Sequence, residues 1–259
     1  MSHDHANTAG PINASATPPN VPPGRIVVIG DLHIGLSDGC AKPVVAWIGR
    51  LQALAPRALY LNGDLFHYLI AHPKFVTSPV DEVFDRLRAL RDSGIPIHYV
   101  EGNRDFFLKG SFAERSVTDV AMEYEVHAGD RKYLIVHGDM INDRDWPYRF
   151  WRRASKNPVS KFAINLIPKK AARNFVDSVE QRLSTSNFKH KSQLPVELMK
   201  RYAKSRAADG YTNIVFGHFH EKRIIPADAV TVTILPPWYE AGEAMIIDPT
   251  TGEFDFARI

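Results

Sequence analysis

Five short motifs hold the residues of this 259-residue chain that could do chemistry, and their polar side chains are carboxylates, imidazoles, two amides and one guanidinium. They are Gly-Asp-Leu-His at 30–33, Asn-Gly-Asp at 62–64, Gly-Asn-Arg-Asp at 102–105, His-Gly-Asp at 137–139 and Gly-His-Phe-His at 217–220. Taken singly, each motif has a simpler explanation, such as a hydrogen-bonded Asp–His pair or a turn asparagine. All five in one chain, each after a run of β-forming residues, favour a shared metal site.

The candidate metal ligands have mixed oxygen and nitrogen donors: Asp31, His33, Asp64, Asn103, His137, His218 and His220. They are too many for one ion but suit two divalent ions, with Mn²⁺ expected and Zn²⁺, Fe²⁺ or Mg²⁺ as alternatives. One carboxylate must bridge the ions, and Asp64 is the expected bridge because it follows the central predicted strand. Two ions about 3.5–4 Å apart acidify a shared water and neutralise phosphoryl oxygens, so the predicted chemistry is hydrolysis of a phosphoester or phosphoanhydride.

Alternating strands and helices are expected to bring these motifs together. Strand-like runs occur at 25–29, 58–61, 97–101, 133–136 and 213–216, and apolar residues at helical spacing occur at 44–54 and 80–91. A hairpin is expected at 123–136, and further strands at 231–235 and 244–247. The pattern predicts an α/β fold with a largely parallel sheet, where ligands bind beyond the carboxyl ends of the strands. Each motif lies at such an end.

The composition indicates an ordinary globular protein, with 44% hydrophobic and 24% charged residues. There is no apolar run of about 18 residues, the length of a membrane span, and no signal-peptide pattern at the N-terminus. The single cysteine, Cys40, excludes an internal disulfide framework. These features predict a cytoplasmic protein with a disordered tail at 1–24 and one domain at 25–259.

Residues 144–206 differ from the rest of the chain in charge. They contain 16 Lys and Arg against 4 Asp and Glu, whereas the remainder contains 16 basic and 25 acidic residues. We expect a basic helical cap inserted into the α/β domain, with an anionic partner. Its aromatic residues admit three interpretations: a wall for acyl chains or a membrane anchor, a nucleic-acid surface, or the cap's own core. The acidic remainder of the chain argues against nucleic acid. The aromatic residues are Trp146, Tyr148, Phe150, Trp151, Phe162 and Phe175.

In this order, Asp-x-His, Gly-Asp, Gly-Asn-x-Asp, His-Gly and Gly-His-x-His resemble the motifs of the calcineurin-like metallophosphoesterase superfamily, from residue 25 to about 247. The resemblance implies a four-layer α/β/β/α sandwich with a dinuclear metal site. By motif position, one ion would take Asp31, His33, Asp64 and His220, and the other Asp64, Asn103, His137 and His218. Asp105 and Asp139 would orient these ligands through hydrogen bonds.

Arg104 departs from most of that superfamily, which has His after Gly-Asn. An arginine stays cationic and cannot act as a general acid, so it would not help an alkoxide to leave. A phosphate leaving group needs no proton donor, because its second pKa is about 6. Arg104 is therefore predicted to be catalytic together with Asp64, holding the oxygens of a pyrophosphate. The simpler alternative is an ion pair with Asp105 or another acid.

Arg104, the run Gly63-Asp64-Leu65-Phe66 and Trp238 together resemble the UDP-2,3-diacylglucosamine pyrophosphohydrolase family of the lipid A pathway. The resemblance implies hydrolysis of this lipid-linked nucleotide to UMP and 2,3-diacylglucosamine 1-phosphate, on the cytoplasmic face of the inner membrane and in contact with its anionic surface. The substrate contacts that it implies are Asn103, Arg104, Asp145, Tyr148, Arg152, Lys189 and Lys191.

The chain departs from this finer pattern after Phe66, where His67, Tyr68 and Leu69 replace an acid and a tryptophan. Gly-His-Phe-His also replaces the commoner Gly-His-Thr-His, and the family's Asp-Val-Asn is missing after Lys191-Ser192. The identity of the substrate's acyl chains and head group therefore stays open. Two other functions also stay open: a soluble nucleotide pyrophosphatase or phosphodiesterase of the same superfamily, and an inactive binding module. The sequence does not indicate the oligomeric state.

Overall fold

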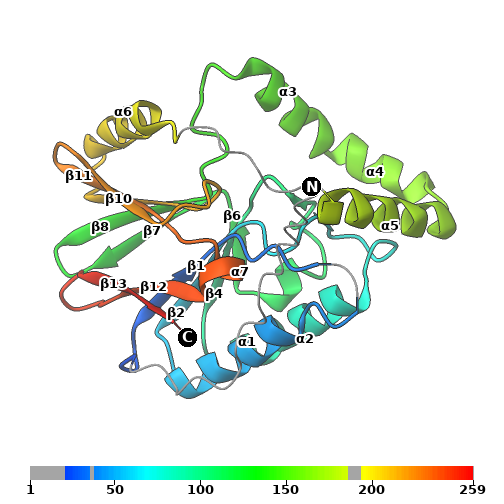
Figure 1. Cartoon of the computed structure of the whole chain (residues 1–259), viewed down its shortest axis with the longest axis horizontal. Coiled ribbons are helices and arrows are strands. Elements are labelled where there is room, and N and C mark those ends of the chain that lie inside the picture. Colours follow the sequence, from blue (N-terminus) through cyan, green and yellow to red (C-terminus); the bar gives the residue numbers. More distant parts are fainter. Residues whose placement is uncertain (1–20, 36–37, 186–193, 259) are drawn as a thin grey trace, which may run out of the picture.

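Two β-sheets pack face to face in the computed structural model, which describes residues 21–35, 38–185 and 194–258 (Figure 1). Most of the expected tail, residues 1–20, lies outside this description. The first sheet has the order β13 (Phe254–Arg258), β12 (Glu243–Ile247), β1 (Ile26–Ile29), β2 (Ala58–Asn62), β4 (Ile97–Val100) and β6 (Asp119–Ala121). The strands from β1 to β6 run parallel, whereas β12 and β13 pair antiparallel. The predicted parallel sheet therefore has an antiparallel edge.

The second sheet has the order β10 (Arg223–Ala227), β11 (Val230–Ile234), β9 (Asn213–Phe216), β8 (Arg131–Val136) and β7 (Glu123–Ala128). Strands β7 and β8 form the predicted hairpin, and β8, β9 and β11 run parallel. A third, two-stranded sheet joins β3 (Leu69–Ile70) to β5 (Asp105–Phe106). Its strands are too short to leave a periodic pattern in the sequence, and so it was not predicted.

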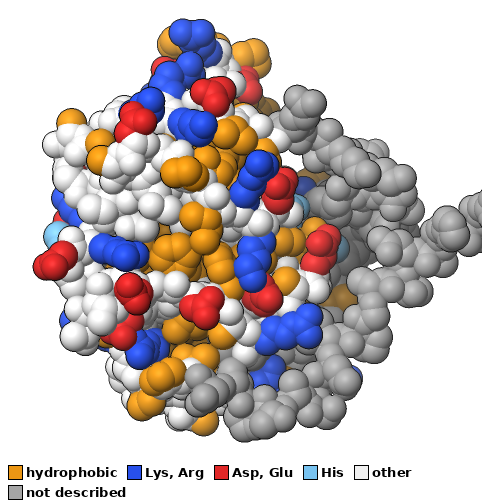
Figure 2. All heavy atoms as spheres, turned by 60° about the vertical axis from the view of Figure 1, so that its left-hand side comes forward, with side chains coloured by type: hydrophobic (Ala, Val, Ile, Leu, Met, Phe, Trp, Pro, Cys, Tyr) orange, Lys and Arg blue, Asp and Glu red, His pale blue; other side chains and the backbone are white. Residues whose placement is uncertain are grey.

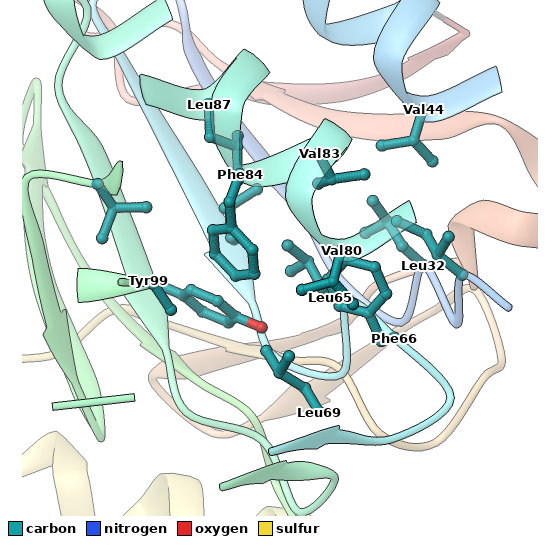
Figure 3. Packing of buried hydrophobic residues seen from close by; sticks show 14 of the residues in the cluster. Leu32, Val44, Leu65, Phe66, Leu69, Val80, Val83, Phe84, Leu87 and Tyr99 are labelled. Carbon is teal, nitrogen blue, oxygen red and sulfur yellow. The ribbon is translucent and has the colours of Figure 1, made fainter. Parts of the chain in front are cut away.

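Three apolar clusters separate the layers. Helices α1 (Lys42–Leu54) and α2 (Ser78–Asp92) cover the first sheet, where Trp47 and Phe84 are buried. Figure 3 shows the apolar side of α2 lying over Leu65, Phe66 and Tyr99, so this core supports the segment directly after Asp64. A second cluster lies between the sheets. A third lies under α6 (Val196–Ala207), which packs on β10 and β11. The four-layer α/β/β/α sandwich is confirmed.

Helices α3 (Trp146–Ser155), α4 (Pro158–Leu166) and α5 (Lys169–Thr185) extend beyond the sandwich (Figure 1), and we call them the arm. The expected cap at 144–206 is thus divided, because α6 belongs to the outer layer of the sandwich. The reason is packing: Met199 and Ala203 give α6 a buried stripe, whereas α3 buries only Arg152 and α4 buries no residue. Two short helices complete the description, the 3₁₀-helix η1 (Glu114–Ser116) and α7 (Trp238–Ala241).

Candidate metal centre

Five of the seven candidate ligands have a left-handed backbone. Asp31, His33, Asp64, His218 and His220 have φ between 45° and 65°, and each lies two or four residues after the end of strand β1, β2 or β9. This conformation is uncommon outside glycine and costs on the order of 1–3 kcal/mol per residue. Such strain persists where the surrounding structure imposes it, typically at functional sites. Here it turns the chain sharply at three neighbouring strand ends.

Glycines in the motifs let these strand ends approach each other. A Cβ added at Gly63 would lie 2.5 Å from His137 Nδ1 and 2.8 Å from Gly102 Cα. At Gly217 it would lie 2.8 Å from Asp31 Oδ2. Contacts this short do not occur, so any side chain here would push the candidate ligands apart.

The first group of candidate ligands is Asp31, His33 and His220. The two Nε2 atoms of His33 and His220 are 3.0 Å apart, and Asp31 Oδ1 lies 3.3 Å from His220 Nε2 and 3.7 Å from His33 Nε2. Two imidazole nitrogens and a carboxylate oxygen thus converge on one point. This donor set fits a borderline divalent ion.

The second group adjoins the first. His137 Nε2 lies 3.6 Å from Asp64 Oδ1, and Asn103 Oδ1 lies 3.0 Å from His137 Nε2 and 2.9 Å from His218 Nδ1. Donor atoms of Asp31, Asp64 and His137 all lie within 4.8 Å of one another. The structure therefore brings all seven predicted side chains together, in two adjoining donor sets that fit two ions. The bridging role of Asp64 stays a prediction.

Hydrogen bonds orient the candidate ligands. His137 Nδ1 lies 2.9 Å from the carbonyl oxygen of Asn62, so it can donate there and leave Nε2 as the metal ligand. Asp105 Oδ2 accepts from the backbone N–H groups of Asp64 (3.0 Å) and Gly102 (2.9 Å). The Tyr99 hydroxyl donates to the other oxygen of Asp105 at 3.0 Å. Asp105 thus connects two of the ligand-bearing loops.

Arg104 borders the second group. Its Nε lies 3.5 Å from Asp64 Oδ2, and its Nη1 donates to the carbonyl oxygen of His67 at 3.1 Å. Asp64 is therefore one acid that lies beside the guanidinium. The side chain keeps 23% of its surface exposed, so the guanidinium is accessible from solvent beside the second group.

Three other residues predicted to contact substrate lie at the base of the arm. Asp145 caps α3, because its Oδ1 accepts from the backbone N–H of Tyr148 at 3.1 Å. The Tyr148 hydroxyl and Arg152 Nη1 both donate to Asp139 Oδ2 at 2.5 Å. These contacts attach the arm next to His137. Lys189 and Lys191 lie outside the described residues.

Tyr239 on α7 was missed by the sequence reasoning. Its ring centroid lies 5.5 Å from that of His33 and 5.9 Å from that of His220, and burial raises its pKa. The only signal was its position after Trp238, which had been singled out. The Tyr239 ring thus packs beside the two imidazoles of the first group.

Burial and neighbouring charges shift the pKa values of the candidate ligands in different directions. Burial lowers the pKa of His33 well below its usual value and that of His218 to about 4, so both imidazoles are neutral and able to bind metal at neutral pH. Burial alone would lower the pKa of His137, but the carboxylates of Asp64, Asp31 and Asp139 outweigh it and raise this pKa. Burial, together with Asp105 and Asp31, raises the pKa of Asp64 to about 7.

Metal binding should therefore release protons near neutral pH. Without metal, the raised pKa values of His137 and Asp64 let this pair hold a proton that a cation must displace. Titration calorimetry of the metal-free protein with Mn²⁺ should give binding heats that change with the ionisation enthalpy of the buffer, and the affinity should rise from about pH 6 to pH 8. Heats that are the same in every buffer would contradict this interpretation.

Comparison with known proteins agrees with this geometry. The sequence pattern described as calcineurin-like phosphoesterase matches residues 24–222, most of the chain, and the chain belongs to this family. The prediction of a metal-dependent hydrolase is thereby confirmed.

Within the family, the chain is similar to curated proteins named UDP-2,3-diacylglucosamine hydrolase. One from Stenotrophomonas maltophilia (strain K279a) is 29% identical over 236 residues, covering 85% of this chain and 93% of that protein. One from Haemophilus influenzae (strain PittGG) is 24% identical over 234 residues, covering 89% and 97%. A third, from Pseudomonas putida (strain F1), is 26% identical over 230 residues, covering 86% and 95%. These proteins match the chain over nearly their whole length.

Proposed function

We propose that this protein hydrolyses the pyrophosphate bond of UDP-2,3-diacylglucosamine to UMP and 2,3-diacylglucosamine 1-phosphate. The observation that carries the proposal is the convergence of seven oxygen and nitrogen donors with Arg104 beside them. The names of the relatives support the substrate, because these proteins match 85% and 89% of the chain.

Two divalent ions, for which we propose Mn²⁺, would be held by the two donor groups. Asp31, His33, Asp64 and His220 would hold one, and Asp64, Asn103, His137 and His218 the other. When bound, such ions supply an acidified water and neutralise phosphoryl charge. The neutral imidazoles of His33 and His218 present lone pairs without having to lose a proton first.

The chain's own residues hold the candidate ligands in place and stabilise the charge of the phosphate that leaves. Asp105 holds the backbone of Asp64 and Gly102, so the loops that carry Asp64 and Asn103 keep one spacing. Arg104 places a permanent cation next to them, where it can pair with the oxygens of the phosphate that leaves. Because a phosphate leaves without a proton, no general acid is needed on this side.

The direct test is hydrolysis of the lipid-linked nucleotide by the purified protein loaded with Mn²⁺. Release of UMP and of the lipid phosphate is expected, and a chelator should abolish it. Hydrolysis of water-soluble nucleotide diphosphates or diesters, with none of the lipid substrate, would overturn the substrate and leave a soluble nucleotide pyrophosphatase or phosphodiesterase. Parallel reactions with Zn²⁺, Fe²⁺ and Mg²⁺ would test the choice of ion.

We further propose that the arm contacts the cytoplasmic face of the inner membrane. Its exposed apolar side chains recur at helical spacing, with Trp146 and Phe150 on α3 (both 73% exposed) and Val159, Phe162 and Leu166 on α4. Residues 146–185, which span helices α3 to α5, carry nine Lys and Arg against two Asp and Glu. Basic and apolar side chains together fit an anionic bilayer surface.

Figure 2 shows a face on which acidic and basic side chains are interspersed among hydrophobic ones, without an excess of one sign. Among the described residues, none of the helices combines the length and apolar character of a membrane-crossing segment. The arm is therefore the part proposed to meet the lipid.

Replacing Phe150 and Phe162 together by Asp should weaken binding to vesicles that contain phosphatidylglycerol. Burying a phenylalanine contributes about 1.5 kcal/mol or more, so the pair should change the partition coefficient by about 100-fold. Vesicle co-sedimentation measures this partition coefficient. The control is Ile224→Asp, since Ile224 is 54% exposed on β10, away from the arm. Equal binding by the double variant and the native protein would rule out this surface.

A further inference from the structure

Lys156 at the end of α3 is bound to the loop that carries Asn103 and Arg104. Its Nζ donates to the carbonyl oxygen of Gly102 at 2.7 Å and to Glu101 Oε1 at 3.0 Å, and only 9% of its side chain is exposed. The ammonium also lies 4.9 Å from the centroid of the Phe106 ring. Lys156 is thus tied to residues on both sides of the Asn103–Arg104 pair.

Arg152, one turn earlier on α3, reaches the same loop. Its Nη1 donates to the carbonyl of Gly102 and its Nη2 to that of Glu101, both at 3.3 Å, and Nη2 lies 3.5 Å from Glu101 Oε1. The same guanidinium binds Asp139, two residues after His137. The base of the arm therefore joins the segment after β4 to the segment after β8.

The opposite side of the loop is fixed by the sandwich. Asp105 accepts from the backbone N–H of Gly102, and the backbone N–H of Arg104 donates to Asp64 Oδ1 at 2.9 Å. The N–H of Gly102 is thus held from the core and its carbonyl from the arm. Asn103 and Arg104 lie between these two restraints. Asn103 Oδ1 is within hydrogen-bond distance of His137 and His218.

We propose that Lys156 and Glu101 are positioning residues, which set the place of Asn103 and Arg104 by holding the residue 101–105 loop to the arm. The inference extends the proposed function and rests on it for the substrate. Because α3 buries only Arg152, its polar contacts determine where it sits, and a movement of the arm would be transmitted to the loop. The groups that Lys156 contacts are Glu101, the Gly102 carbonyl and the Phe106 ring, and none of them is a candidate ligand, so its effect must pass through this loop.

The test is Lys156→Met, which keeps the length of the side chain and removes its donors. Hydrogen exchange of the metal-free protein should be faster in a peptide that covers residues 101–106. Affinity for the more weakly bound Mn²⁺ and kcat should each fall about 10-fold, the usual effect of losing a partner that orients a metal ligand. Lys156→Arg, which keeps a donor to the Gly102 carbonyl, should recover much of both losses. Glu101→Gln, which keeps an acceptor for Lys156, should have a smaller effect than Lys156→Met.

The matched control is Lys161→Met on α4, which removes one hydrogen bond between arm and sandwich, from Lys161 Nζ to the carbonyl of Lys109. It should leave exchange at 101–106 and Mn²⁺ affinity unchanged. Equal effects of the two Lys→Met variants, or no effect of Lys156→Met on exchange and affinity, would overturn the proposal. Exchange and affinity need no substrate, and an activated aryl phosphodiester can report kcat. A wrong substrate assignment would therefore leave the test intact.

Discussion

Arg104→Ala is expected to lower kcat for the lipid-linked pyrophosphate by about 10²–10³-fold, the range found when one charge-stabilising donor is removed from an active site. The guanidinium lies 3.5 Å from Asp64 and is partly exposed, so it can reach both the centre and the oxygens of a departing phosphate. Its loss would leave the charge on that phosphate without a fixed counter-charge. Single-turnover kinetics with saturating lipid nucleotide would measure the effect on the chemical step.

An activated aryl phosphodiester is the discriminating substrate. Its leaving group has a single delocalised charge and no second phosphate for Arg104 to bind, so the same variant should lose less than about 10-fold on it. Metal content should not change, because the guanidinium is not a ligand. Arg104→Lys should be intermediate, since an ammonium keeps the charge but loses the bidentate geometry. Equal losses on both substrates would refute the leaving-group argument.

The strand ends of the centre could be predicted because each combines two simple signals. A run of β-forming residues identifies β1, β2, β4, β8 and β9, and a polar motif with glycine marks the place where each one ends. Parallel strands then bring their carboxyl ends to the same edge of a sheet. Asp31, Asp64 and Asn103 could thus be expected near one another, and the second sheet adds His137 and His218.

Other features depend on tertiary contacts that leave little trace in the sequence. The stripe of α6 around Met199 has the same helical spacing as the residues of the arm, and only the neighbouring sheet decides that it is buried. The two-residue strands β3 and β5 are too short to carry a periodicity, and the edge strand β13 shows only a brief alternation at Phe254 and Phe256. The resemblance to the UDP-2,3-diacylglucosamine pyrophosphohydrolase family implied a substrate contact for Arg152, which stays a prediction, and only the structure shows its ion pair with Asp139.

Asp64→Asn should have opposite effects on activity and on the stability of the metal-free protein. The amide keeps the shape of the carboxylate, and its oxygen can still accept from the backbone N–H of Arg104. The neutral amide cannot bridge two cations as the carboxylate anion does. Loss of about 4 kcal/mol of charge stabilisation would lower kcat by about 10³-fold. Metal analysis after dialysis should find less than the native content.

The metal-free variant, by contrast, should be more stable than the native protein. Burial and the neighbouring carboxylates raise the pKa of Asp64 from 3.8 to about 7, so the folded state keeps a proton that the unfolded chain loses as pH rises through this interval. Ionising Asp64 therefore destabilises the fold, by an amount that grows up to about pH 7. The neutral amide of the Asp64→Asn variant does not ionise and so escapes this cost.

Thermal unfolding in the presence of a chelator would show the effect as a Tm difference that is small at about pH 4 and larger at about pH 8, at about 2–4 °C for each kcal/mol. Asp143→Asn is the control, since that carboxylate is 75% exposed and should change Tm little at either pH. With saturating Mn²⁺ the order should reverse, because the native protein gains binding free energy that the variant lacks. If the variant is less stable than the native protein both with chelator and with Mn²⁺, the Asp64 carboxylate stabilises the fold itself. The prediction that its ionisation destabilises the metal-free protein would then be wrong.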